Sequence, residues 1–125
     1  MSIDLAYAAG FFDGEGSIGI YRTNQTQIQI SNTCRAALEE FVKLFGGHVG
    51  KVPAKHMEAK NPKWRPAYYW RLYGRNASKA LQEMLPYLKE KKPQAELFLT
   101  FVEMSPEDKK NSDIPQQLKK LKKVT

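Results

Sequence analysis

The first stretch of apolar residues has the composition of a helix. Residues 3–12 are rich in Ala and Leu, follow the possible N-cap residues Ser2 and Asp4, and stop at the Asp-Gly-Glu-Gly sequence of residues 13–16. The pattern predicts a helix over residues 3–12, with both acidic side chains of the Asp-Gly-Glu-Gly sequence following its C-terminal end.

The next two segments alternate between apolar and polar positions, as half-buried strands do. Residues 17–23 and 27–31 are joined through Asn24-Gln25, which predicts a hairpin. Its apolar face consists of Ile18, Ile20, Ile28 and Ile30, and its polar face of Gly19, Tyr21, Gln27 and Gln29.

Helix and strand signals then follow a second time. Apolar side chains at helical spacing predict a helix over residues 35–45, which ends at Gly46-Gly47. Residues 48–52 and 66–73 have the composition of strands and predict a second hairpin. The long loop between these strands is basic and holds Lys55, Lys60, Lys63 and Arg65.

The remaining apolar residues fall on two further helices, separated by a charged connector over residues 89–92. The first helix has Asn76 or Ser78 as its cap and ends near Pro86, and the second opens at Pro93. The order helix, hairpin, helix, hairpin, helix, helix predicts an α+β fold. In this fold a four-stranded antiparallel sheet carries the helices on its apolar face and leaves its polar face open.

Charge narrows the choice of partners. The 125 residues hold 20 Lys and Arg against 13 Asp and Glu, a net charge of +7, which favours nucleic acid over other partners. Residues 1–20 are an exception, because they carry three acids and no Lys or Arg. One cysteine and two histidines argue against disulfides and structural zinc, and no apolar run could span a membrane. We therefore expect a soluble, intracellular protein.

The Lys-rich end of the chain continues beyond the predicted core. We expect a domain over residues 1–104 and a basic C-terminal tail over residues 105–125. The lysines of residues 118–123 favour a solvated helix face, with DNA contact as the alternative.

Asp13 and Glu15 carry the sharpest chemical signal. A carboxylate at the C-terminal end of a helix faces the negative end of the helix dipole, which is unfavourable unless a cation compensates it. Carboxylate, carbonyl and water oxygens, completed by phosphate, form the site that Mg²⁺ prefers. An Asp-Gly turn with a solvated glutamate fits the spacing equally well.

Residues 8–16 read AAGFFDGEG and are followed by Ser17-Ile18. This stretch resembles the nine-letter motif of the LAGLIDADG homing endonucleases in their single-motif form. Residues 30–33, 44–47 and 85–91 extend the resemblance, which covers residues 5–104.

The resemblance implies a metal site and a two-fold homodimer. Glu15 takes the place of the acid that binds the catalytic metal, and the carbonyl of Gly14 is a second metal contact. Asp13 is implied to shape the turn at the helix end. The expected dimer interface on the first helix consists of Ala6, Ala9, Gly10 and Asp13.

Further residues are implied to act on water and phosphate. Lys91, or else Lys89, matches a basic residue that organises active-site water. Asn32 falls at a polar, water-binding position, for which a helix cap is an equal alternative. Arg35, one helical turn further on, is expected to contact phosphate or water.

The implied activity is that of an intron-encoded homing endonuclease, which cuts double-stranded DNA at a specific site. The expected cofactor is Mg²⁺ or another divalent cation, such as Mn²⁺, or Ca²⁺ in a non-cleaving complex. A single motif supplies one acidic helix end, so cutting both strands of a pseudo-palindromic target needs a dimer. The alternatives are a non-cleaving DNA-binding regulator, an RNA splicing cofactor (maturase) of the same fold, and a structural interaction domain.

The open face of the sheet is the expected DNA-reading surface. Arg and Gln recognise guanine and adenine through paired hydrogen bonds in the major groove. Strand alternation places Tyr69, Arg71 and Tyr73 on this face, beside Tyr21, Gln27 and Gln29. Phosphate contacts are expected from Lys51, Lys55, Lys63 and Arg65. The alternative is that Tyr69, Arg71 and Tyr73 are ordinary exposed strand residues with good β-propensity.

Overall fold

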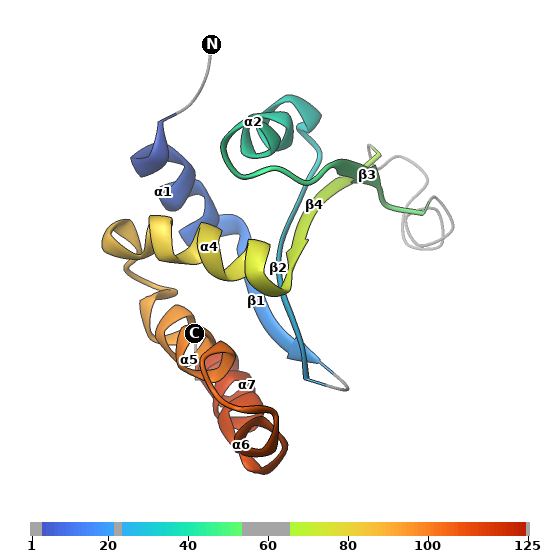
Figure 1. The fold of residues 1–125 in the computed structure, drawn as a ribbon. Helices are drawn as coiled ribbons and strands as arrows, with labels where there is room; N and C mark the ends of the chain where they lie inside the picture. The colour runs from blue at the N-terminus through green and yellow to red at the C-terminus, as the bar shows by residue number, and fades with distance from the viewer. Residues whose placement is uncertain (1–3, 22–23, 54–65, 125) are drawn as a thin grey trace.

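The computed structural model describes residues 4–21, 24–53 and 66–124 (Figure 1). A twisted sheet has helices on one face, and no helix of the described residues covers the other face (Figure 1). This two-layer arrangement confirms the predicted α+β fold with one open sheet face.

The sheet has four antiparallel strands in the order β1-β2-β4-β3. The strands are β1 (Gly16–Tyr21), β2 (Gln25–Asn32), β3 (Val49–Lys51) and β4 (Tyr68–Tyr73). The two predicted hairpins join through β2 and β4, in a register that places Gln29 opposite Arg71. The second pair of strands is shorter than predicted, and the basic loop between them, with Lys55, lies outside the described residues.

The helices are α1 (Leu5–Glu15), α2 (Arg35–Phe45), α4 (Gly74–Met84), α5 (Lys92–Val102), α6 (Pro106–Asn111) and α7 (Ile114–Val124). A short 3₁₀ helix, η2 (Leu85–Tyr87), follows α4. The prediction for residues 35–45 is confirmed, and Pro93 stands in the first turn of α5 as expected.

The prediction that the first helix stops at Phe12 is wrong. The α1 helix begins after Asp4, whose side chain accepts the N–H of Tyr7 at 2.8 Å, and it continues through Glu15. The chain then enters β1 without a loop. Only glycine fits at Gly16, because a Cβ there would collide with the ring and carbonyl of Phe12. Glu15 is therefore held at the junction of helix and sheet.

The start of the third predicted helix is also corrected. The α4 helix begins at Gly74 with Tyr73 as its N-cap residue, so neither Asn76 nor Ser78 caps it. The Ser78 hydroxyl instead donates to the carbonyl of Gly74 inside the first turn. Turn-forming residues are tolerated in this turn because the rest of the helix packs in the core.

The core lies between the sheet and the helices. The isoleucines predicted for the inner face of the first hairpin, Ile18, Ile20, Ile28 and Ile30, are all buried. Trp70 of β4 joins them, packs against Phe41 and Phe45 of α2, and donates its Nε1–H to the carbonyl of Gly46 at 2.9 Å. The burial of these residues determines which side chains of the strands face the helices and which face the open side of the sheet.

The segment beyond residue 104 is helical and contributes to this core. Ile114 and Leu118 of α7 belong to the buried cluster, and α7 packs against α5 and β1. Figure 1 shows α7 returning alongside α5 in the opposite direction. None of the described helices has the length and apolar character that a membrane crossing requires.

We predict that Leu118→Ala lowers the free energy of unfolding by about 2–5 kcal/mol, because it empties a buried site. The matched control is Lys119→Ala, which removes an exposed neighbour and should change stability by less than about 0.5 kcal/mol. Urea unfolding of the three proteins measures the difference. Equal stability of Leu118→Ala and the wild type would show that α7 does not contribute to the core in solution.

Candidate active site and nucleic-acid interface

The C-terminal end of α1 presents oxygen atoms to solvent. Glu15 is the last residue of the helix, and both Glu15 and Gly14 are exposed. The last four carbonyls of a helix have no partner within it, and Gly14 is one of these residues. A carboxylate and a main-chain carbonyl are thus available next to each other.

Asp13 has a different environment, although it lies only two residues away. Its carboxylate accepts three backbone N–H groups of the connector, from Lys89 at 3.2 Å, Glu90 at 3.0 Å and Lys91 at 2.9 Å. Burial alone would raise the pKa of Asp13, but these hydrogen bonds and the Lys91 charge hold it below the usual 3.8. We call this arrangement the Asp13 clamp.

The clamp brings Lys91 to the end of α1. The Lys91 ammonium is half-buried and donates to the carbonyl of Asp13 at 2.7 Å. A cation at this position is favourable because it faces the negative end of the helix dipole. Lys89, the alternative predicted at this position, contributes a backbone N–H to the clamp.

Asn32 and Arg35 lie where β2 leads into α2. Because Gly16 pairs with Ile30, this end of β2 is the end beside the α1–β1 junction. The side-chain oxygen of Asn32 accepts the N–H of Cys34 at 2.8 Å, and Cys34 is the N-cap residue of α2. Arg35 pairs with Glu39 at 3.3 Å on the exposed helix surface.

The oxygen atoms at the end of α1 suit a hydrated divalent cation. Among the described residues no group of three or more His, Cys, Asp or Glu could hold a metal ion. An all-protein metal cage is therefore not present in this part of the chain. One carboxylate and one carbonyl, completed by water and phosphate oxygens, are the donor set typical of Mg²⁺ in phosphoryl chemistry.

The exposed side of α1 carries small residues at intervals of four. Ala6, Gly10 and Gly14 are exposed, and a Cβ at either glycine would meet no atom of the described residues within 4 Å. Packing within the described part of the chain therefore does not require glycine at positions 10 and 14. The expectation that Ala9 shares this surface is corrected, because Ala9 is fully buried in the core. Asp13 is half-buried, and its place in a dimer interface stays a prediction.

The open face of the sheet carries a hydrogen-bonded network centred on Arg71. Its Nε donates to Gln29 at 2.8 Å, and its Nη1 donates to the hydroxyl of Tyr73 at 3.2 Å. Gln27 donates to the same Gln29 oxygen at 3.4 Å. The guanidinium also lies over the Tyr69 ring, 4.6 Å from its centroid. All five side chains are on the face where strand alternation placed them.

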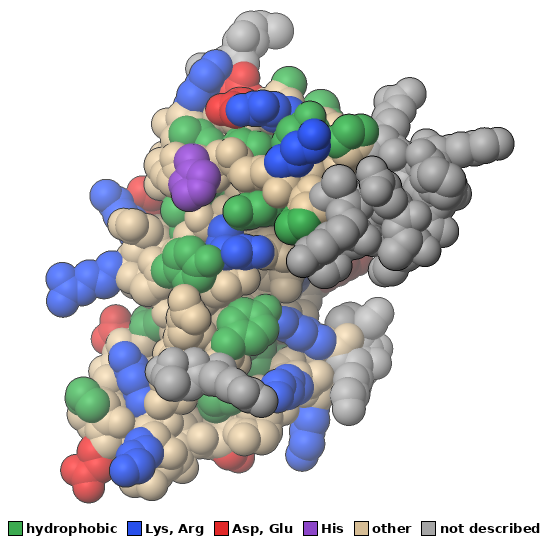
Figure 2. Space-filling model, turned by 90° about the vertical axis from the view of Figure 1, so that its right-hand side faces the viewer, with side chains coloured by type: hydrophobic (Ala, Val, Ile, Leu, Met, Phe, Trp, Pro, Cys, Tyr) green, Lys and Arg blue, Asp and Glu red, His purple; other side chains and the backbone are tan. Residues whose placement is uncertain are grey.

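Basic and aromatic groups surround this network. Tyr21 is 48% exposed, Tyr73 of the network itself is 44% exposed, and Lys51 is exposed on β3. Figure 2 looks onto this side of the molecule and shows Lys and Arg side chains across it, with acidic side chains mainly near its margins. This distribution suits a polyanion that lies across the sheet.

A groove that sequence reasoning did not identify lies where α6 and α7 meet β1. It has a volume of about 500 Å³ and is lined by Tyr21 together with Lys109, Lys110 and Lys119. The one feature of the sequence that pointed toward this groove is the lysine-rich composition of the C-terminal segment. Its placement beside Tyr21 depends on the packing of α7, which a local pattern does not encode.

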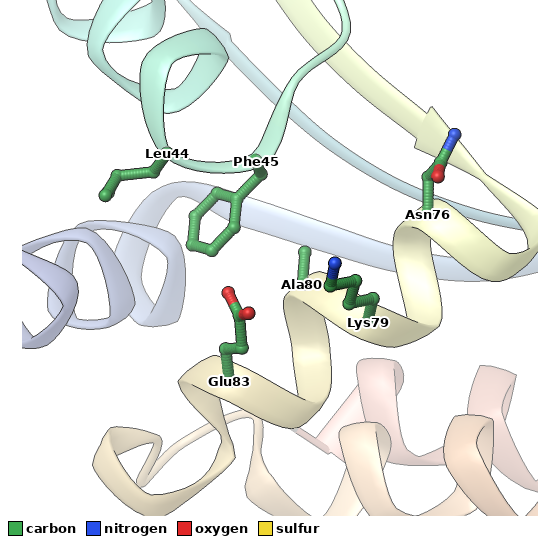
Figure 3. A pocket seen from close by; sticks show the side chains of 6 residues that line it. All are labelled: Leu44, Phe45, Asn76, Lys79, Ala80 and Glu83. Carbon is green, nitrogen blue, oxygen red and sulfur yellow. The ribbon is translucent and has the colours of Figure 1, made fainter.

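A second cavity, between α2 and α4, is shown in Figure 3. Its volume is about 150 Å³, which is smaller than the roughly 300–1,000 Å³ of ordinary small-molecule sites. Its lining residues are Leu44, Phe45, Asn76, Lys79, Ala80 and Glu83, and none of them is a predicted site residue.

Comparisons with known proteins agree with this architecture. Solved structures of three homing endonucleases are similar to the chain. The structure of I-CvuI in complex with the I-CreI target has a TM-score of 0.74 and 20% identity, and the match covers 94% of this chain and 80% of that one. The archaeal intron-encoded I-Vdi141I, complexed with DNA, has a TM-score of 0.65 and 17% identity, over 94% and 82% of the two chains. I-TnaI has a TM-score of 0.64 and 18% identity, over 99% of both chains.

At these identities the structures show the fold alone, and no curated protein matches the sequence. The family is shown by a sequence match. A model of the LAGLIDADG-like domain matches residues 2–86, a span that holds α1, all four strands and the whole of α4. The chain therefore belongs to the LAGLIDADG family.

Proposed function

We propose that this protein is a site-specific endonuclease that hydrolyses double-stranded DNA with the help of divalent cations. The observation that carries the proposal is the exposed Glu15 carboxylate at the end of α1, next to a clamped lysine and a basic sheet face. Membership of the LAGLIDADG family supports it, as do the DNA complexes of the similar I-CvuI and I-Vdi141I.

The cation would be held by the Glu15 carboxylate and the Gly14 carbonyl. The similar I-CvuI was crystallised with the I-CreI target in 2 mM Mg, where the DNA was not cleaved, and with its own target in 2 mM Ca. Both support the use of a divalent cation. From the donor set of one carboxylate and one carbonyl we propose Mg²⁺ for cleavage, with Mn²⁺ as a substitute and Ca²⁺ as a non-cleaving ion. When bound, such a cation supplies Lewis-acid activation of water and stabilises the leaving oxygen.

The remaining residues of the site position water and offset charge. Lys91 would hold a water molecule near the scissile phosphate and offset the negative charge that develops during hydrolysis. Asn32 and Arg35, at the same end of the sheet, would bind water or phosphate. Asp13 acts on the reaction only through the clamp, which holds Lys91 in place, and is a positioning residue.

Cleavage of both strands requires two such sites, so we propose a two-fold homodimer formed through α1. Ala6, Gly10 and Gly14 would allow the two helices to approach closely, and both copies of Glu15 would then lie near the dyad. The target of a two-fold dimer is an approximately palindromic sequence.

The open sheet face would read this sequence. Arg71, Gln27, Gln29 and the nearby tyrosines would contact base edges, and Lys51 and Lys55 would contact phosphates. Glu15, Lys91 and the reading face all lie in the proposed endonuclease domain over residues 1–104, against which α7 packs. The basic segment over residues 105–125 would add phosphate contacts through Lys109, Lys110 and Lys119 of the groove.

Incubation of the purified protein with a library of inverted-repeat duplexes, randomised in each half-site, tests the proposal. In Mg²⁺ we expect enrichment of cut products that share one palindromic sequence. Duplexes that are bound but never cut, in either Mg²⁺ or Mn²⁺, would instead indicate a DNA-binding regulator. Failure to bind any duplex would refute a role on DNA.

We predict that Glu15→Gln abolishes cleavage of the selected duplex and leaves its binding intact or tighter. The amide keeps the shape of the side chain but binds a divalent cation poorly, and one negative charge facing phosphate is lost. Single-turnover cleavage and equilibrium binding measure the two effects. Glu96→Gln, at an exposed position on α5, is the matched control and should cut normally. Cleavage by Glu15→Gln at the wild-type rate would remove Glu15 from the metal site.

We predict that Gly10→Leu prevents dimer formation. In one chain the new side chain meets open space, so the monomer should stay folded and could gain helix stability. Between two closely packed helices, the same side chain causes overpacking that costs about 1–3 kcal/mol or more. Sedimentation of the free and DNA-bound protein measures the state, with Ala36→Leu on exposed α2 as the control. A wild-type chain that sediments as a monomer in both conditions would contradict the dimer.

We predict that Arg71→Ala relaxes base preference symmetrically in both half-sites, by about 1–3 kcal/mol for each base pair that Arg71 reads. Lys51→Ala should instead weaken binding to all sequences alike. It should also make the decrease of the logarithm of the DNA-binding constant with the logarithm of salt concentration less steep by about one. Cleavage profiles of single-base target variants separate the two outcomes. An unchanged profile for both Arg71→Ala and Gln29→Ala would mean that the open face does not read sequence.

A further inference from the structure

The C-terminal helix returns to the end of the molecule that carries the proposed cleavage site. The α7 helix packs against both α5 and β1. Because it runs in the opposite direction to α5, its C-terminal end lies beside the start of α5 (Figure 1). The residue at the start of α5 is Lys91, which is the N-cap residue of that helix.

The spacing of residues along α7 directs one lysine inward. Ile114 and Leu118 are buried, and Lys122 follows at the same interval of four residues, which places it on the same helix face. Lys122 is half-buried, whereas Lys119 and Lys120 are exposed. Lys122 is therefore the inward lysine among Lys119, Lys120 and Lys122.

Electrostatic coupling between the two lysines agrees with this placement. Burial lowers the pKa of Lys122 below its usual 10.5, and the positive charge of Lys91 lowers it further. The Lys91 ammonium in turn lies 2.7 Å from the carbonyl oxygen of Asp13, two residues before Glu15. The Lys122 ammonium thus lies within electrostatic reach of the ammonium that is held at the end of α1.

A phosphate group that approaches this end of α1 meets unfavourable charge. The Glu15 carboxylate and the negative end of the helix dipole both repel it. Each cation near the helix end reduces that repulsion, and a partly desolvated cation does so more strongly than an exposed one because screening by water is weaker.

We propose that α7 supplies a second lysine to the cleavage site, so that Lys122 and Lys91 together attract the DNA phosphate to the C-terminal end of α1. The inference rests on the proposed endonuclease function and adds a contribution from a helix that lies outside the family match over residues 2–86.

Four proteins test the inference on the duplex selected with the wild type: Lys122→Met, Lys122→Arg, Lys91→Met and the exposed control Lys120→Met. We expect Lys122→Met to slow single-turnover cleavage in Mg²⁺ about tenfold, less than the hundredfold or more typical of a group that contacts the reacting oxygen. The logarithm of the DNA-binding constant decreases as the logarithm of the salt concentration rises. The steepness of this decrease should be smaller by about one, as for the loss of one phosphate contact. Lys122→Arg should restore both quantities, and Lys120→Met should change neither.

Thermal unfolding of each variant separates a local effect from misfolding, because Met can occupy the half-buried position and should preserve the wild-type midpoint. Cleavage and salt dependence of Lys122→Met equal to those of the wild type would overturn the inference and leave the endonuclease function intact. A rate loss that Lys122→Arg does not restore would also overturn it, because a positive charge would then not be the required property. A wild-type protein that cuts no duplex would overturn both proposals together.

Discussion

The Asp13 clamp is the interaction on which the proposed site depends. It joins the end of α1 to a connector 76–78 residues further along the chain, through three backbone N–H groups and one ammonium. Without these donors, an acidic residue in the last turn of a helix would oppose the helix dipole, and the helix would be less stable there. The clamp engages both oxygens of the Asp13 carboxylate, which stays ionised, whereas the Glu15 carboxylate is exposed at the end of the helix. The two acids, which are separated by one glycine, therefore differ in role. Asp13 binds the connector within the chain, and Glu15 faces solvent.

Much of the fold could be predicted from local pattern. Alternating isoleucines identified the inner face of the first hairpin, and the apolar spacing of residues 35–45 gave α2 its observed bounds, because both signals lie within one element. The end of α1 could not be predicted in the same way. The sequence Asp13-Gly14 reads as a helix stop, and the groups that allow the helix to continue come from the distant connector.

The site was predictable in part for the same reason. Glu15 stands in a contiguous motif, and its exposure at a helix end follows from that motif. Ala6 and Ala9 look equivalent in the sequence, yet the rotation of α1 exposes the first and buries the second. The inward position of Lys122 depends on how α7 docks, and the buried apolar residues among the described side chains of α7 are Ile114 and Leu118. Tertiary contacts of this kind leave little trace in a Lys-rich segment.

The position of Glu15 explains why a cation is needed at the end of α1 in addition to the basic groups on the sheet. An acid that meets DNA is opposed by every nearby phosphate, and a two-fold dimer would bring two such acids to the same place. Basic groups far from the helix end raise overall affinity, but at physiological salt their effect on Glu15 is screened over about 8 Å. Cations must therefore lie at the helix end itself, which is where the clamp holds Lys91. The basic surface of the sheet would thus bind the DNA backbone. The cation at the end of α1 would offset the repulsion between Glu15 and the phosphates.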